Sequence, residues 1–93
     1  MNIEPDILLE ITELAGLFIP PKRIARIIEL DIEEFLAELI IEGSDVYRAF
    51  YAGFDAADVE LRKSIIRIAK QGSQPAQEHA KKFITQLKSE LYE

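Results

Sequence analysis

The sequence predicts an all-α protein, and three observations lead to this fold class. Apolar residues recur at intervals of three and four along most of the 93-residue chain, which is the period of an amphipathic helix. Prolines and glycines stand where one such stretch gives way to the next. The composition, 48% apolar and 30% charged, is that of a chain that can bury a core. These signals together predict five helices.

The first helix is predicted to begin near Pro5 and to stop before Pro20-Pro21. Proline disfavours the α conformation in the residue before it, and Pro21 suits the first turn of a second helix that runs to Leu30. The inward face of the first helix consists of Ile7, Leu8, Ile11, Leu14, Ala15 and Phe18. The second helix is expected to turn Ile24, Ile27 and Ile28 inward and to leave Lys22, Arg23 and Arg26 in water.

The third helix is predicted to start at Asp31. Aspartate at this position accepts a hydrogen bond from the free N–H groups of a helix start. Glu33 and Glu34 in the first turn suit the positive end of the helix dipole. The buried residues of this helix are expected to be Phe35, Leu36, Leu39 and Ile40.

A long fourth helix follows, because Gly43 can end the third helix and Ser44 can cap the next, which runs to about Gln71. It could instead break at Gly53-Phe54-Asp55, since Asp55 could cap a new helix. Two apolar stripes run along the helix, and two stripes imply two packing partners. One consists of Val46, Phe50, Phe54, Ala57, Leu61, Ile65 and Ile68, and the other of Tyr47, Tyr51, Ile66 and Ala69.

The last helix follows the turn Gly72-Ser73-Gln74-Pro75, in which glycine ends one helix and proline occupies the first turn of the next. Its apolar face consists of Ala76, Ala80, Phe83, Ile84, Leu87 and Leu91. We expect it to form an antiparallel helical hairpin with the fourth helix. The prediction is one all-α domain over residues 1–93, with a three-helix unit at 1–42 and a long-helix hairpin at 43–93.

The charge is unevenly distributed within the net value of −6. Residues 1–42 carry ten acids and three bases, whereas residues 43–93 carry seven acids and eight bases. The chain has no cysteine, so neither disulfides nor thiolate zinc sites are expected, which suits a cytoplasmic location. Its longest apolar runs are only a few residues, which predicts no membrane span and no signal peptide.

Residues 21–40 have the spacing of a helix-turn-helix. That motif needs a small residue where its two helices cross, apolar neighbours, a tight turn and an apolar anchor in the next helix. Ala25 lies between Ile24 and Ile28, and Leu30 and Phe35 follow at the required distances. The predicted fold is therefore a three-helix helix-turn-helix unit followed by a long helix and a helical hairpin.

These residues resemble the helix-turn-helix domain of bacteriophage terminase small subunits. The likeness lies in Ile24-Ala25, Leu30-Asp31 and Glu33-Glu34-Phe35. It continues in Ala49-Phe50-Tyr51-Ala52-Gly53, Glu60-Leu61-Arg62 and Ala69-Lys70-Gln71-Gly72-Ser73, and covers about residues 7–85. The resemblance implies recognition of viral double-stranded DNA, delivery to a large terminase subunit, and homo-oligomerisation through the long helix and hairpin.

Two residue choices depart from the family pattern. The turn usually carries glycine, and this chain has Glu29 there, which predicts a turn that is one residue longer or less tight. The third helix offers Glu33, Glu34, Glu38 and Glu42 and no base, and acids in a groove oppose phosphate binding. Contact with DNA is therefore expected away from the third helix, and the candidate residues are Lys22, Arg23, Arg26, Arg62, Lys63, Arg67 and Lys70. The bases around the turn between the last two helices, including Lys81 and Lys82, are better explained as a solvated face, and phosphate contact is the alternative.

The candidate oligomer interface consists of Tyr47, Tyr51 and Ile66. The same stripe could instead hold the fourth helix against the first three. A second function stays open beside DNA binding, namely an acidic helical module that binds protein on the same scaffold.

Catalytic residues are not evident in the sequence. The only histidine, His79, has no cysteine or second histidine to share a metal ion, and no glycine-rich phosphate loop is present. Carboxylates such as Glu33, Glu34 and Glu38 on a short exposed helix are usually a solvated face. We therefore expect a non-enzymatic protein without cofactor or metal.

Overall fold

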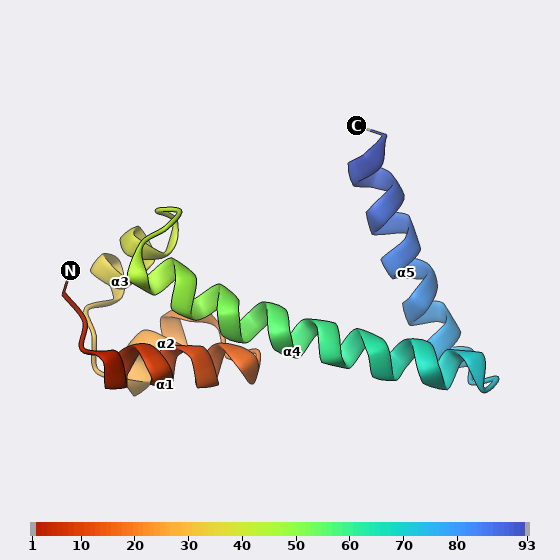
Figure 1. The fold of residues 1–93 in the computed structure, drawn as a ribbon, viewed down its shortest axis with the longest axis horizontal. Helices are drawn as coiled ribbons and strands as arrows, with labels where there is room; N and C mark the ends of the chain where they lie inside the picture. The colour runs from red at the N-terminus through yellow and green to blue at the C-terminus, as the bar shows by residue number, and fades with distance from the viewer. Residues whose placement is uncertain (1, 93) are drawn as a thin grey trace. The chain divides into compact units, whose positions relative to one another are not determined.

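The computed structural model describes residues 2–92, and within that range the chain forms helices and no strand. The elements, shown in Figure 1, are α1 (Pro5–Gly16), α2 (Pro21–Ile27), α3 (Ile32–Leu39), α4 (Asp45–Lys70) and α5 (Gln74–Leu91). The prediction of an all-α fold with five helices is confirmed.

The chain divides into two compact units, residues 1–58 (unit 1) and residues 59–93 (unit 2). The division falls inside α4 rather than at residue 43, because Val46 and Phe50 at the start of α4 are buried with the first three helices. In Figure 1 these helices gather around the first turns of α4. Unit 1 therefore comprises α1, α2, α3 and the first half of α4.

The core of unit 1 is made of apolar side chains from all four of its helices. Its buried members are Ile11, Ala15, Ile24, Ala25, Phe35, Val46 and Phe50. Phe35 is the largest of the fully buried side chains. Ala25 is also fully buried, as expected for the small residue at a helix crossing.

Ile27 and Ile40 were predicted to be buried but are exposed, and Phe18, which was predicted on the inward face of the first helix, is 44% exposed. Ile27 is 49% exposed and Ile40 is 83% exposed. Both lie at or beyond the end of a helix that is shorter than predicted, since α2 stops at Ile27 and α3 at Leu39. Once the helical path ends, a spacing of three or four residues no longer returns a side chain to the same face.

The early end of α2 is caused by a left-handed residue. Glu29 has φ of 58°, the N–H of Leu30 donates to the carbonyl of Ala25, and the N–H of Glu29 donates to that of Arg26. This is the Schellman arrangement, which usually has glycine at the left-handed position. The prediction of a longer or less tight turn was wrong, because Glu29 itself adopts the conformation that glycine would have there.

Phe18 ends α1 in the same way and does not continue its apolar face as a helical residue. Its φ is 61°, and the following N–H of Ile19 donates to the carbonyl of Leu14. The Phe18 ring packs edge-on against Phe54 of α4, with centroids 5.8 Å apart. This contact and the two hydrogen bonds of the motif hold a non-glycine residue in a conformation that costs about 1–2 kcal/mol.

The helix starts follow the predicted caps. The Asp31 carboxylate accepts from the N–H of Glu34 at 2.9 Å, and the Ser44 hydroxyl accepts from the N–H of Tyr47 at 3.0 Å. Ser73, which lay in the predicted turn, accepts from the N–H of Ala76 at 3.4 Å. Each cap satisfies a donor that has no partner within its own helix.

The possible break at residues 53–55 does not occur, because α4 is continuous from Asp45 to Lys70. Gly53 is instead buried where α1 crosses α4, and a Cβ atom there would overlap with the carbonyl oxygen of Thr12. Beside this contact the Thr12 hydroxyl donates to the carbonyl of Ala49 at 2.9 Å. Glycine is thus required at this point for close approach of two backbones.

Unit 2 consists of the last turns of α4, a turn at Gly72 and α5. Contacts join Ala69 to Gln77 and Arg62 to Phe83, an order consistent with the predicted antiparallel hairpin. The apolar face of α5 is covered only near its start. Ala76 is buried and Ala80 and Phe83 are half-buried, but Ile84, Leu87 and Leu91 are 53%, 59% and 65% exposed.

Candidate functional site

Three exposed bases of α4 lie along one face of its last turns. Lys63, Arg67 and Lys70 are spaced by four and three residues, which places them on the same side of a helix. Together with Ile66 and Gln71 they line a shallow hollow of about 460 Å³. Lys63 also forms an exposed ion pair with Glu60 at 3.1 Å, an interaction that contributes little stability in water.

Arg62 belongs to the same predicted set but performs a packing role. Its guanidinium carbon lies 4.2 Å from the centre of the Phe83 ring, and Nη2 donates to the side-chain oxygen of Gln86 at 3.4 Å. Arg62 is half-buried by these contacts. It therefore links α4 to α5, and its replacement would disturb unit 2 as well as remove a charge.

The remaining candidate bases lie on α2 in unit 1. Lys22, Arg23 and Arg26 are all exposed, as predicted, and lie within about one turn of each other. The seven candidate bases are thus divided between the two units. Three lie on unit 1 and four lie on unit 2.

An apolar hollow adjoins the basic face of unit 2. Its volume is about 330 Å³ and it is lined by Ile66, Ala69, Lys70, Ala80, Phe83 and Ile84. It shares Ile66 and Lys70 with the hollow along α4. Sequence reasoning placed Ala80, Phe83 and Ile84 in a packed helical face and so missed this surface. The signal was present in the second stripe of the fourth helix, which needed a partner.

The three residues of the predicted oligomer interface do not lie together in one unit. Tyr47 and Tyr51 are in unit 1, with ring centroids 4.7 Å apart, and Tyr51 also packs against Phe50 at 5.2 Å. Tyr51 is 38% exposed and Tyr47 is half-buried, so this pair largely covers the core of unit 1. Ile66 is in unit 2, 40% exposed, at the edge of the apolar hollow.

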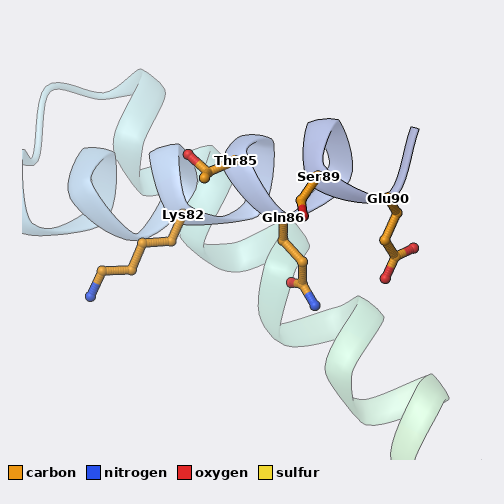
Figure 2. A pocket seen from close by; sticks show the side chains of 5 residues that line it. All are labelled: Lys82, Thr85, Gln86, Ser89 and Glu90. Atoms are coloured by element: carbon orange, nitrogen blue, oxygen red, sulfur yellow. The ribbon is translucent and has the colours of Figure 1, made fainter. Parts of the chain in front are cut away.

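A hollow of about 550 Å³ along α5 is a poor candidate for a site. Figure 2 shows that all five side chains lining it come from α5, namely Lys82, Thr85, Gln86, Ser89 and Glu90. All five are exposed. A surface formed by one helix alone does not enclose a ligand in the way that small-molecule sites do.

The acidic third helix and the histidine show no arrangement for metal chemistry. Glu33 and Glu34 are exposed on α3, and His79 is exposed on α5. Within residues 2–92 no group of three or more His, Cys, Asp or Glu side chains is placed to hold a metal ion. Over the same residues, no helix combines the length and the apolar character needed to cross a bilayer.

The two units differ strongly in charge. Residues 1–58 carry thirteen acids and four bases, a balance of −9, whereas residues 59–93 carry four acids and seven bases, a balance of +3. The positive charge of this acidic chain is therefore concentrated on α5 and the last turns of α4. An anionic partner is attracted to unit 2 and repelled by unit 1.

No protein-family model matches this chain, and neither the curated proteins nor the solved structures contain a significant match to it.

Proposed function

We propose that this chain is a non-enzymatic protein that binds double-stranded DNA through the basic face of unit 2 and forms homo-oligomers. The resemblance to terminase small subunits gives the role, in which the protein brings viral DNA to a large terminase subunit. The observation that carries the DNA part is the exposed row of Lys63, Arg67 and Lys70 on a unit of net charge +3.

Phosphate contact is the interaction for which such a face is suited. DNA affinity comes largely from lysine and arginine side chains that neutralise phosphates and release counterions. Three bases over two helical turns span about 10 Å, which is enough to follow neighbouring phosphates along one strand. Contact through α3 is disfavoured, since Glu33 and Glu34 are exposed there. The binding we propose is therefore weak, salt-sensitive and largely independent of base sequence.

Titration against duplex DNA at several salt concentrations tests this proposal. The double variant Arg67→Gln, Lys70→Gln should flatten the slope of log affinity against log salt by up to about two. Arg67 and Lys70 are preferred to Arg62, whose replacement would also remove the contact with Phe83. The matched control, Arg48→Gln with Lys88→Gln, loses the same charge away from the basic face and should leave a slope closer to that of the parent. Equal slopes in the two double variants would contradict the proposal.

The acidic surface of unit 1 favours a second function, the binding of protein. Ile40 and Ile41 are 83% and 52% exposed beside the acidic residues of α3, which gives a surface with apolar and anionic character. The variant Glu33→Gln, Glu34→Gln distinguishes the two functions. If neither the parent nor this variant associates with duplex DNA at low salt, the protein-binding function replaces the DNA-binding one.

A further inference from the structure

The apolar hollow of unit 2 has the chemistry of a docking site for an acidic, apolar helix. Its lining is apolar apart from Lys70, and Phe83 and Ile84 provide its bulkiest side chains. Lys63 and Arg67 border Ile66 at its edge. Among the described residues near this hollow, Ile84 and Leu87 are more than half exposed, so α5 leaves apolar surface uncovered. An apolar surface rimmed by bases favours an apolar partner with carboxylates at its margin.

The outer face of α1 carries that complementary chemistry. While Ile11 and Ala15 enter the core, Leu9 and Leu17 are 63% and 69% exposed. Asp6, Glu10 and Glu13 are exposed on the same side, and α1 contains no base. Residues 6, 9, 10 and 13 recur at helical spacing within α1, so Leu9 and the carboxylates share one face, and the exposed Leu17 follows at the C-cap of the helix.

We propose that the outer face of α1 in one copy docks in the hollow of unit 2 of a second copy. Leu9 and Leu17 supply the apolar contact, and Glu10 and Glu13 face Lys63, Arg67 and Lys70. The charges of −9 on unit 1 and +3 on unit 2 attract the two surfaces.

This contact joins two different surfaces, so a copy that binds through one of them still offers the other to a further copy. Such a heterologous interface generates a closed ring or an open chain rather than a two-fold dimer. The inference rests on the self-association part of the proposed function and names its interface, while the DNA part is tested separately by the salt slopes. It also predicts that duplex DNA competes with α1, because phosphates and the α1 carboxylates neutralise the same bases.

Charge reversal in two variants tests the contact without DNA. One variant carries Glu10→Lys and Glu13→Lys, and the other carries Lys63→Glu and Arg67→Glu. Each places like charges at the interface, so each alone should associate at least about tenfold more weakly than the parent by analytical ultracentrifugation. Mixed in equal amounts, the two variants should associate again, since the reversed α1 then meets the reversed hollow.

Several results would overturn the proposal. Self-association of either variant at the strength of the parent would show that the assembly uses other surfaces, including a symmetric contact between two copies of unit 2. A mixture that stays at the monomer mass of 10.6 kDa would exclude the charge pairing. A parent protein that stays at this mass would exclude self-association. That result is expected if α1 docks within its own chain. The control Glu33→Lys, Glu34→Lys changes the charge of unit 1 equally and should associate like the parent. Salt slopes for DNA binding are measured on other variants, so failure here leaves the DNA proposal standing.

Discussion

Unit 1 and unit 2 are both helical, but among residues 2–92 the buried core lies in unit 1. Seven buried side chains from four helices pack together in unit 1, whereas Ala76 is the buried apolar residue of unit 2 among the described residues. In unit 2 the large apolar residues are mostly exposed, namely Val59, Leu61, Ile66, Ile68, Ile84, Leu87, Leu91 and Tyr92. The difference indicates that unit 1 carries the stability of the fold, and it favours unit 2 as the binding surface that we propose.

The small size of unit 2 is consistent with the proposed docking. Unit 2 has 35 residues, and chains below about 40 residues rarely bury enough surface to fold without further support. Continuity of α4 with unit 1 provides part of that support. The exposed face of α5 would gain more from a second copy, in line with the proposed docking.

The largest expected effect is on the free energy of unfolding when one phenylalanine ring is removed, first from unit 1 and then from unit 2. Phe35→Ala should lower the free energy of unfolding by about 3–5 kcal/mol, because Phe35 is fully buried in unit 1. Phe83→Ala should cost about 1 kcal/mol, because this ring is half-buried and packs against the guanidinium group of Arg62. Denaturation by urea, followed by circular dichroism, measures both. Equal costs would contradict the difference between the units.

The close approach of α1 and α4 predicts that replacing a glycine by alanine in α4 lowers stability, which is the opposite of the usual effect. Replacing a helical glycine by alanine ordinarily stabilises by about 1 kcal/mol. Gly53→Ala should instead destabilise by about 2–3 kcal/mol, because the new methyl group overlaps with the Thr12 carbonyl oxygen. Thermal melts compare this variant with Ala56→Gly, an exposed control on the same helix that should cost about 1 kcal/mol. A Gly53→Ala protein more stable than its parent would mean that α1 and α4 do not cross there.

The smallest expected effect concerns the left-handed turn within unit 1. Glu29→Gly should raise the free energy of unfolding by about 0.5–1 kcal/mol, because glycine adopts φ of 58° without steric cost. Gly43→Ala, at φ of 83° and with no atom near the added methyl group, should lower it by a similar amount. The same urea denaturation experiment measures whether each of these two changes raises or lowers the free energy of unfolding. A destabilised Glu29→Gly variant would show that the turn does not require the left-handed conformation.

Local signals predicted the helices of this chain well. The residues that start these helices act on the neighbouring backbone, so the local sequence is enough to predict their effect. They are the prolines Pro5 and Pro21 and the capping residues Asp31 and Ser44. The left-handed Glu29 was missed, since glutamate has no preference for that conformation and only the surrounding helices impose it.

Long-range features could not be predicted in the same way. Gly53 was interpreted as a possible helix break. Glycine is required there because of the carbonyl of Thr12, which lies 41 residues earlier in the sequence, so the neighbouring residues do not reveal the requirement. The candidate site shows the same limit. Exposed bases at Lys63, Arg67 and Lys70 followed from helical spacing, but the apolar hollow beside them depends on how closely α5 approaches α4.

Hydrogen exchange at two protein concentrations tests most directly whether unit 1 carries the fold and unit 2 the binding surface. Amides at Ile11, Ile24 and Phe35 should be protected equally in dilute and concentrated solution, because their protection comes from the core of unit 1. Amides of α5 around Phe83 and Leu87 should exchange rapidly when dilute and slow down as the concentration rises and copies associate. Protection of α5 as strong as that of unit 1 in dilute solution would contradict the account.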